Sequence, residues 1–256
     1  MARLEGRVCI VTGAAQGLGA AYAKAMAGEG ARVVVADVKD CAPIAKEITE
    51  TYQGAEVLSL RTDVSDEASV QEMIDKTLER FGRLDVLVSN AAVFADIDFK
   101  RIDDIPVEEW NHVMAVNIRG PFLCAKAALV PMRKQKYGKI INISSGTVFR
   151  GTPGLLHYVS SKGAVLAMTR SLSREVGDDN ICVNTVAPGL TESEGVLSHG
   201  GMVQGTEMGN AIIASRALKR PQLPDDLTGT VIFLASAESD FITGQCIVVD
   251  GGSMMN

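Results

Sequence analysis

Short apolar runs alternate with longer amphipathic segments along this chain of 256 residues. The runs are apolar at successive positions, which suits strands that are buried on both faces of a parallel sheet. The segments between them, such as Gly17–Glu29 and Ser65–Arg80, have helical spacing. This alternation predicts an α/β fold, a doubly wound parallel β-sheet with helices on both faces. The predicted strands are Val8–Thr12, Val33–Asp37, Val57–Leu60, Val86–Ser89, Ile140–Ser144, Val183–Ala187 and Cys246–Val249.

The chain contains no internal repeat, charge block or proline-rich linker that would mark a domain boundary. Its length suits one α/β unit, so we expect residues 1–256 to form a single domain. Two stretches depart from the alternation. Val107–Lys136 has the spacing of one long helix, and the segment around 191–215, rich in Gly and Met, is expected to be a loose, mobile loop at the substrate site.

Composition excludes some classes of partner and location. The formal net charge of −6 creates no field that would attract nucleic acid or an anionic membrane. The start of the chain has no long apolar stretch typical of a signal peptide or membrane span, so a cytoplasmic protein is expected. The five cysteines lack zinc spacing and suggest buried thiols in a reducing compartment, with no metal site: Cys9, Cys41, Cys124, Cys182 and Cys246.

A glycine turn follows the first predicted strand, and a helical pattern begins directly after it. The turn reads Thr12-Gly13-Ala14-Ala15-Gln16-Gly17-Leu18-Gly19. Glycine permits a tight turn and lets a pyrophosphate approach the positive end of the next helix. The spacing is G-x-x-x-G-x-G rather than G-x-G-x-x-G. Strand, turn and helix together predict a dinucleotide cradle; the alternative is that these are ordinary turn and packing glycines.

Asp37 ends the second predicted strand, eighteen positions after Gly19. A carboxylate there can accept hydrogen bonds from both hydroxyls of the adenosine ribose and would repel a 2′-phosphate. Neither Gln16 nor Val38 supplies the cation that such a phosphate needs. The pattern therefore favours NAD over NADP. The alternative is that Asp37 merely caps the next helix.

Tyr158 and Lys162 lie four positions apart within Leu155–Val176, a segment of helical spacing, so their side chains share one face. An ammonium beside a phenol is expected to lower the pKa of the phenol toward working pH and make it a usable acid or base. An isolated pair of this kind more often belongs to a solvated helix face. Upstream, the predicted strand from Ile140 ends in Ser144-Ser145, at the edge where parallel sheets bind ligands.

The chain resembles the short-chain dehydrogenase/reductase family over nearly its whole length. The resemblance implies a Rossmann fold and a nicotinamide-dependent oxidoreductase. Two departures occur: Ser89-Asn90-Ala91-Ala92 replaces the usual Asn-Asn-Ala-Gly, and Ser193 replaces a threonine. The motifs that carry the resemblance are Thr12–Gly19, Asp63-Val64, Asn90-Ala91-Ala92, Asn117, Ser145, Tyr158, Lys162 and Pro188-Gly189.

The resemblance also implies roles for single residues. Ser145, thirteen positions before the tyrosine, is preferred over Ser144 as the catalytic serine. Asn117 would hold a water that links Lys162 to solvent, and Lys162 would also grip the nicotinamide ribose. Asp63 and Val64 would contact adenine. The full predicted cofactor set is Gly13, Gln16, Gly17, Leu18, Gly19, Asp37, Val38, Asp63, Val64, Asn90, Ala91, Ala92, Tyr158, Lys162, Pro188, Gly189, Thr191 and Ser193.

The predicted substrate wall is mostly apolar, although each residue in it could instead belong to the core. Such a lining suits a secondary alcohol, a ketone or an aldehyde with a hydrophobic or aromatic body better than a sugar or an anion. The wall combines Val93, Phe94, Ser145, Thr147, Phe149, Leu155, Leu156, Leu190, Met202 and Met208. His157 adjoins the tyrosine, but it is expected to be a packing or surface residue.

These observations predict a soluble NAD-dependent alcohol dehydrogenase in which Asn117, Ser145, Tyr158 and Lys162 are the catalytic set. Two alternatives stay open: an NADP-linked carbonyl reductase of the 3-oxoacyl-thioester type, and a non-catalytic NAD(H)-sensing regulator. The resemblance further implies a homotetramer built on the Val107–Lys136 and Leu155–Gly177 helices.

Overall fold

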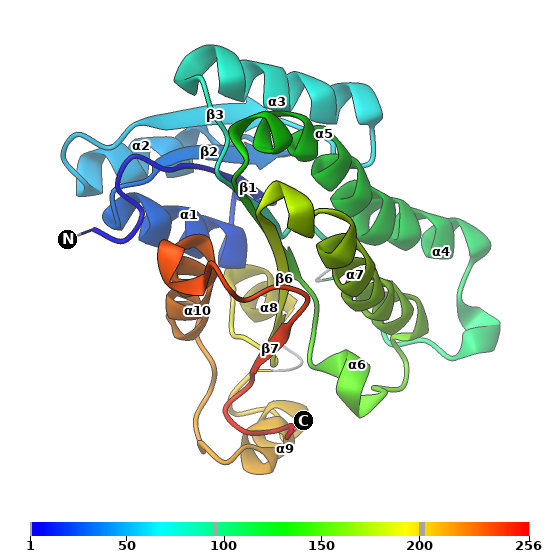
Figure 1. Ribbon diagram of the computed structural model, residues 1–256. Helices are drawn as coiled ribbons and strands as arrows, with labels where there is room; N and C mark the ends of the chain where they lie inside the picture. Colours follow the sequence, from blue (N-terminus) through cyan, green and yellow to red (C-terminus); the bar gives the residue numbers. More distant parts are fainter. Residues whose placement is uncertain (1, 95–96, 200–202, 256) are drawn as a thin grey trace.

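Seven parallel strands form one sheet in the order β3-β2-β1-β4-β5-β6-β7 (Figure 1). The structure, a computed structural model, describes residues 2–94, 97–199 and 203–255. All seven predicted strands are present, and their ends lie within two residues of the predicted ends. The strands are β1 Val8–Thr12, β2 Arg32–Asp37, β3 Val57–Arg61, β4 Val86–Ser89, β5 Gly138–Ile143, β6 Ile181–Pro188 and β7 Cys246–Val249.

Helices cover both faces of the sheet, which confirms the doubly wound fold predicted from the alternation (Figure 1). The helices are α1 Gly17–Gly28, α2 Ala42–Thr51, α3 Glu67–Phe81, α4 Val107–Met114, α5 Gly120–Gln135, α6 Thr147–Arg150, α7 Leu156–Glu175, α8 Glu194–His199, α9 Glu207–Ser215 and α10 Asp225–Ala235. Short 3-10 turns lie at η1 Ile102–Asp104, η3 Gly177–Asp179 and η4 Ala237–Ser239.

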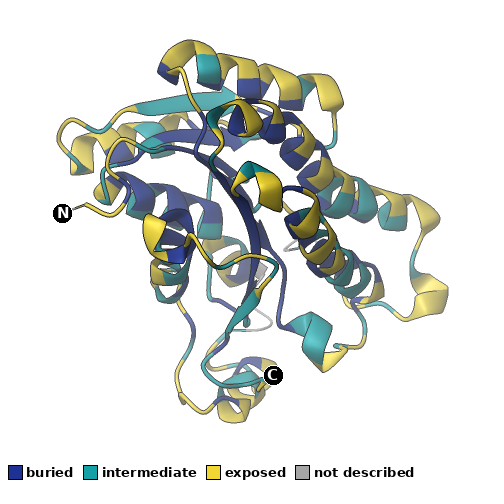
Figure 2. Ribbon diagram, in the orientation of Figure 1, coloured by how far each residue is buried: buried dark blue, intermediate teal, exposed yellow. Residues whose placement is uncertain are grey.

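Successive residues of a central strand enter different cores, which explains why apolar residues stand at successive positions of these strands. In β1, Cys9 and Val11 pack on the α1 and α10 side, whereas Val8 and Ile10 pack on the α3 and α5 side. All four side chains are fully buried. The central strands are accordingly dark in Figure 2, the edge strands β3 and β7 are of intermediate burial, and the helices are buried mainly on their inner sides. Each such aliphatic side chain contributes about 1.5–3 kcal/mol through burial.

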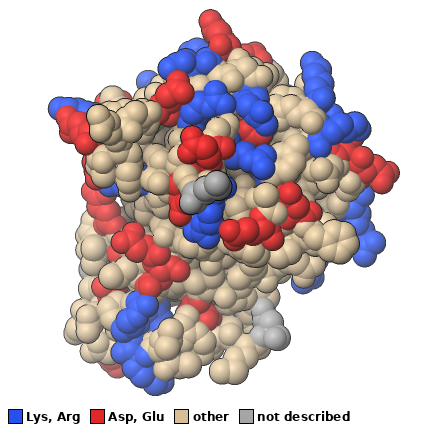
Figure 3. Space-filling view, turned by 60° about the vertical axis from the view of Figure 1, so that its left-hand side comes forward, with Lys and Arg blue, Asp and Glu red and all other residues tan. Residues whose placement is uncertain are grey.

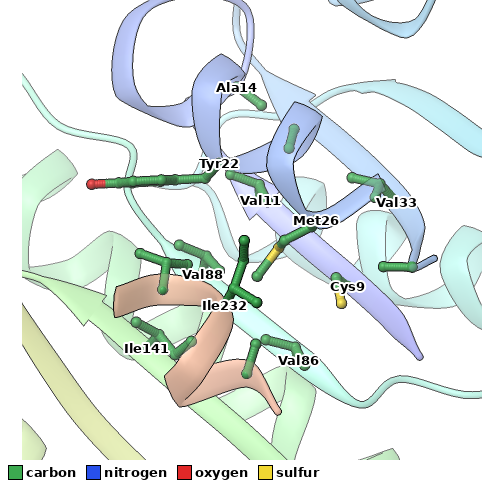
Figure 4. Packing of buried hydrophobic residues seen from close by; sticks show 14 of the residues in the cluster. Cys9, Val11, Ala14, Tyr22, Met26, Val33, Val86, Val88, Ile141 and Ile232 are labelled. Atoms are coloured by element: carbon green, nitrogen blue, oxygen red, sulfur yellow. The ribbon is translucent and has the colours of Figure 1, made fainter. Parts of the chain in front are cut away.

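The core on the α1 side is drawn in Figure 4. Tyr22 and Met26 of α1 and Ile232 of α10 lie over Val11 and Val88 of the sheet. Tyr22 is fully buried, and burial raises the pKa of its hydroxyl well above the usual value. These contacts hold α1 against the sheet, so the turn that precedes α1 sits on a fixed support.

The predicted helix Val107–Lys136 is continuous but not uniform. A π-helical turn, η2 Ala115–Arg119, separates α4 from α5, and the helix ends at Gln135, with Lys136 in the left-handed region at φ 53°. An 18-residue window of this helix has a mean hydropathy of 1.4, and the helix is long and apolar enough to cross a bilayer. However, 56% of that apolar window is buried inside the protein, which accounts for the hydropathy.

The segment around 191–215, expected to be a loose and mobile loop, contains two helices, α8 and α9, while its mobility stays a prediction. Thr206 caps α9 because its hydroxyl accepts a hydrogen bond from the Gly209 N–H at 3.1 Å. This cap, with Glu207 in the first turn, is a local helix signal that the Gly- and Met-rich composition obscured. Met202, which the sequence placed in the substrate pocket, lies outside the described residues.

Charge is dispersed over the surface. On the face shown in Figure 3, acidic and basic side chains are interspersed, and neither sign covers the face alone.

All five cysteines are free, and burial raises the pKa of Cys124 to about 12, so this thiol stays protonated. Within residues 2–94, 97–199 and 203–255, no group of three or more His, Cys, Asp or Glu side chains is placed to hold a metal ion.

Candidate active site

A cavity of about 970 Å³ opens at the carboxyl ends of the strands and extends from the glycine turn to α9. Nearly all residues of the predicted cofactor set line it: Gly13, Gln16, Gly17, Leu18, Asp37, Val38, Asp63, Val64, Asn90, Ala91, Ala92, Tyr158, Lys162, Pro188, Gly189, Thr191 and Ser193. Ser145 lines the same cavity, whereas Gly19 and Asn117 do not. Residues from six strand ends therefore share one space, as the fold requires of its ligand crevice.

The glycines of the turn stand where the backbone has a positive φ or where neighbouring atoms leave no room for a Cβ. Gly13 and Gly17 have φ values of +66° and +60°, in the region that side chains disfavour. A Cβ on Gly19 would lie 2.1 Å from the carbonyl oxygen of Gly13, so Gly19 lets α1 begin directly against the turn. On the other side, a Cβ on Gly17 would lie 3.6 Å from Cβ of Ser193. The turn therefore forms a cradle between α1 and the segment after β6.

The N-terminus of α1 is open toward this cradle. Gln16 precedes the helix in an extended conformation, and no side chain among the described residues caps the first turn, which also lacks acidic residues. Its backbone N–H groups and the helix dipole suit an anion. A pyrophosphate fits such an end, so the residues present fit a dinucleotide cofactor.

Asp37 lies in the cavity wall at the end of β2. Its carboxylate accepts hydrogen bonds from the N–H groups of Ala15, at 3.1 Å, and Lys39, at 3.0 Å. It does not cap α2, because α2 begins at Ala42 and the Ala42 N–H donates to Asp40 at 2.9 Å. The alternative of a simple capping role is therefore wrong.

Lys39 is a cavity residue that the sequence interpretation missed. Its ammonium donates to Oε1 of Gln16 at 3.0 Å, which places a cation beside Asp37 at the ribose end. The sequence could have indicated it, because Lys39 stands only two positions after Asp37. It weakens the inference that this end of the site has no basic group.

Asn90 connects the glycine turn to β4. Its Nδ2 donates to the carbonyl oxygens of Thr12 at 2.9 Å and Gly13 at 3.1 Å. In return, Oγ1 of Thr12 accepts the N–H groups of Asn90 and Ala91. Both amide hydrogens of Asn90 are used in this way, so its side chain holds the cradle in shape. Ala91 and Ala92 follow without a left-handed backbone.

Ser145, Tyr158 and Lys162 meet in the middle of the cavity. The Ser145 hydroxyl oxygen accepts hydrogen bonds from the N–H and hydroxyl groups of Thr147, at 3.2 and 3.0 Å, and is hydrogen-bonded to Tyr158. The Lys162 ammonium lies 5.7 Å from the Tyr158 ring centre and donates to the carbonyl oxygen of Ile143 at 2.9 Å. Ser144 donates to the Lys162 carbonyl oxygen at 2.8 Å, so its hydroxyl is already engaged.

The pKa of Tyr158 differs from the sequence prediction. Burial raises it to about 12, although the hydrogen bond with Ser145 acts in the lowering direction. Burial also lowers the pKa of Lys162 to about 8. The predicted depression of the phenol pKa is therefore wrong for this structure, because removal from water outweighs the ammonium, which is turned toward Ile143. The phenol is protonated at neutral pH in this arrangement.

Asn117 lies in the π-helical turn, fully buried, and its side chain spans two elements. Its Oδ1 accepts the Val93 N–H at 2.8 Å, and its Nδ2 donates to the Val93 carbonyl and to the Ser161 hydroxyl, each at 3.1 Å. Both side-chain N–H groups are used. The water that the resemblance implies would therefore need another group of this residue, and the side chain itself ties the cavity wall to α7.

The substrate end differs in part from the prediction. Phe94, Thr147, Leu155, Leu190, Val93 and Met208 line the cavity, and the ring centres of Phe94 and Tyr158 lie 4.7 Å apart. Phe149 and Leu156 do not line it. On α6, Thr147 and Arg150 are one turn apart and face the cavity, so Phe149 turns away. Leu156 is exposed because Leu155 and Tyr158 occupy the inner face.

His157 is fully buried, which agrees with the predicted packing role. Its Nε2 lies 2.8 Å from Oε1 of Glu109, and Lys100 pairs with the other carboxylate oxygen of Glu109. The link holds α4 and the segment before it against α7.

The chain is similar to known oxidoreductases over nearly its whole length. The chain matches the family model described as enoyl-(acyl carrier protein) reductase over residues 13–254. It is 34% identical to a 3-oxoacyl-(acyl-carrier-protein) reductase of Thermotoga maritima over 98% of both chains. It is 36% identical to galactitol 2-dehydrogenase of Agrobacterium fabrum over 99% of this chain and 100% of the relative.

Among solved structures, levodione reductase superimposes with a TM-score of 0.91 at 30% identity, over 97% of this chain and 98% of that one. The fold and the site together define a nicotinamide-dependent oxidoreductase. The chain belongs to the short-chain dehydrogenase/reductase family.

Proposed function

We propose that this protein is an NAD-dependent dehydrogenase that interconverts a secondary alcohol, or a primary alcohol and aldehyde, with the corresponding carbonyl compound. The observation that carries the proposal is one cavity that holds Asp37 at its ribose end and Ser145, Tyr158 and Lys162 at its centre. A carboxylate at the ribose end favours free hydroxyls over a 2′-phosphate.

The cradle residues would hold the dinucleotide. The N–H groups at the start of α1 would bind the pyrophosphate, Asp37 the adenosine ribose, Asp63 and Val64 the adenine, and Lys162 the nicotinamide ribose. When bound, the nicotinamide accepts or donates the hydride. The protein supplies position and proton transfer.

Ser145 is suited to hold the substrate oxygen. Its oxygen accepts two hydrogen bonds from Thr147, and its hydrogen, which is directed to the Tyr158 oxygen in this structure, would donate to a carbonyl or carbinol oxygen once the substrate is bound. In oxidation, Tyr158 as phenolate takes the hydroxyl proton of the substrate; in reduction, Tyr158 as phenol returns it. A protonated Lys162 favours the phenolate and thereby assists oxidation.

The apolar part of the wall supports a substrate with a hydrophobic or aromatic body. Phe94, Leu155, Leu190 and Met208 contribute this surface, and burial of such a body would supply binding energy. The rival NADP-linked reductase of 3-oxoacyl thioesters has specific support in Lys39 and in the relative from Thermotoga maritima. Cofactor comparison separates the two.

The test is an assay of hydrophobic and aromatic secondary alcohols with NAD and with NADP, using wild type and Tyr158→Phe. We expect turnover with NAD, and a loss of about 10²–10⁴-fold in turnover for Tyr158→Phe with NADH affinity retained in a fluorescence titration. Preference for NADP would favour the rival reductase. Tight NADH binding with no turnover of any alcohol or carbonyl would favour a non-catalytic regulator.

We also propose a homotetramer in the cytoplasm. Apolar side chains on α5, Phe122 and Val130, are half exposed, and Phe241 is fully exposed; contacts between copies would cover them. Five free cysteines support a reducing compartment. Light scattering after gel filtration measures the mass, and a monomer at micromolar concentration would contradict the assembly.

A further inference from the structure

Two arginines line the end of the cavity formed by α6 and the segment that follows α9. Arg150 is the last residue of α6, and Arg216 directly follows α9. The C-terminal segment joins them there, because α9 and the C-terminus lie side by side (Figure 1) and Ser215 and Ser253 are 2.9 Å apart. Three segments distant in sequence therefore bring cationic and hydroxyl groups to one place in the cavity wall, which Asp250 also lines.

Arg150 is exposed to the cavity and has only neutral partners among the described residues. Its Nη2 donates to the hydroxyls of Ser253 and of Ser215, the latter at 3.3 Å. The structure assigns it no salt bridge within residues 2–94, 97–199 and 203–255. Its charge is therefore held in position by two hydroxyls and is not neutralised.

Arg216 is 3% exposed and also lacks a carboxylate partner in the described part of the chain. Its Nη1 donates to the carbonyl of Arg220 at 2.8 Å and its Nη2 to the carbonyl of Leu190, but its Nε has no hydrogen-bond partner among the described residues. Burial lowers the pKa of this guanidinium, with Asp250 opposing the shift. A buried guanidinium with an unused N–H is costly unless a ligand satisfies it.

The acidic groups nearest to Arg216 are occupied elsewhere. Asp250 accepts the N–H groups of Gly252, Ser253 and Met254 at 2.9–3.0 Å. Glu192 accepts the Gln204 N–H at 2.6 Å. By contrast, Arg220 on the same segment is fully paired, with both terminal nitrogens 2.6 Å from the Asp226 carboxylate. The two cavity arginines thus differ from their neighbour in making no salt bridge among the described residues, although Asp250 and Glu192 lie near enough to favour the charge of Arg216.

We propose that Arg150 and Arg216 form a carboxylate-binding subsite, so that the substrate is a hydroxy acid or oxo acid with an apolar spacer between carbinol and carboxylate. Arginine pairs with carboxylates through parallel hydrogen bonds, and Ser215 and Ser253 hold the Arg150 guanidinium in place by accepting from its Nη2. The apolar residues that line the same cavity would contact the spacer. The inference rests on the proposed dehydrogenase function and replaces the expectation that anions are disfavoured.

The test compares oxo acids with their methyl esters. The substrates are methyl ketones with a terminal carboxylate, in a series of increasing chain length, assayed with NADH. We expect wild type to prefer the best acid over its ester by about 10–100-fold in kcat/KM. Arg150→Met should abolish this preference by lowering kcat/KM for the acid to the level of the ester, while Arg150→Lys should keep part of it.

Arg80→Met on α3 is the matched control, since it removes one arginine from an exposed site that pairs with Glu56 outside the cavity. It should preserve the preference. Equal kcat/KM values for acid and ester in wild type, or equal losses for both in Arg150→Met, would overturn the subsite.

Calorimetric titration of the same acids into the NADH-bound protein separates the subsite from the reaction. Binding of the acid but not the ester, lost in Arg150→Met, supports the subsite even where no substrate turns over, in which case only the proposed function fails. Turnover of neutral ketones with no acid binding by wild type overturns the subsite and leaves the proposed function standing.

Discussion

The two ends of the cavity are built in different ways. The cofactor end uses main-chain geometry: Gly13 and Gly17 adopt positive φ, Gly19 removes a side chain from a contact, and Asn90 ties the turn with backbone hydrogen bonds. The substrate end uses side chains from α6, α7, α9 and the C-terminal segment. The first end tolerates almost no added atom, whereas the second can exchange side chains without moving the sheet.

This difference indicates which end of the cavity can change its specificity by substitution. A backbone cradle can change little, because a side chain added there collides with main-chain atoms that cannot move. A wall of side chains on short helices sets substrate choice and can change residue by residue. The following predictions test each end separately.

Gly19→Val should have the largest effect. Its Cβ would lie 2.1 Å from the Gly13 carbonyl oxygen, so the turn must open and NADH affinity should fall by more than about 100-fold. Fluorescence titration measures the affinity. Gly177→Val, at a glycine with open space around its Cβ position, is the control and should bind NADH normally. Unchanged affinity in Gly19→Val would show that the cradle is not the cofactor site.

Asp37→Ala should shift coenzyme choice by about 10–100-fold toward NADP, because the carboxylate that repels a 2′-phosphate is lost while Lys39 stays. The ratio of kcat/KM values for the two coenzymes is the measurement. Asp75→Ala on α3 removes the same charge outside the cavity and should leave the ratio unchanged. An unaltered ratio in Asp37→Ala would place the ribose contact elsewhere.

The pH profile should show the effect of the buried phenol. Since burial raises the pKa of Tyr158 to about 12, only a small phenolate fraction exists at neutral pH, and this fraction grows about tenfold per pH unit. Oxidation should therefore rise about tenfold per unit between pH 6 and 8, while reduction, which uses the phenol, stays nearly level. Lys162→Met removes a charge that favours the phenolate, so it should lower the oxidation rate at every pH in this range and leave the slope unchanged. A flat oxidation profile would contradict this.

Phe94→Ala should have the smallest effect and act only at the substrate end. The ring packs 4.7 Å from Tyr158 and lines the cavity, so its loss should raise KM for a bulky alcohol several-fold. NADH affinity should stay the same. Phe149→Ala is the matched control, since Phe149 does not line the cavity. Equal kinetic effects of the two substitutions would argue against this placement of the wall.

Much of the fold could be predicted because apolar runs with helical segments between them leave few alternatives. The cofactor end was also predictable, since Gly13, Gly17 and Asp37 follow from what a backbone cradle requires. The rest depends on contacts distant in sequence. Arg216 enters the cavity through the packing of α9, Phe149 leaves it because α6 is a single turn, and the Tyr158 pKa follows from burial. None of these three features can be predicted from a local sequence pattern.

The π-helical turn at Ala115–Arg119 has a consequence for how such a chain can diverge. A π turn accommodates one residue more than a regular α-helical turn, so it behaves as an insertion within a helix. Loss of a single codon there would restore a regular helix and rotate Asn117 away from Val93 and Ser161. The sheet would be unaffected, but the tie between cavity wall and α7 would be lost. One deletion could thus separate folding from catalysis.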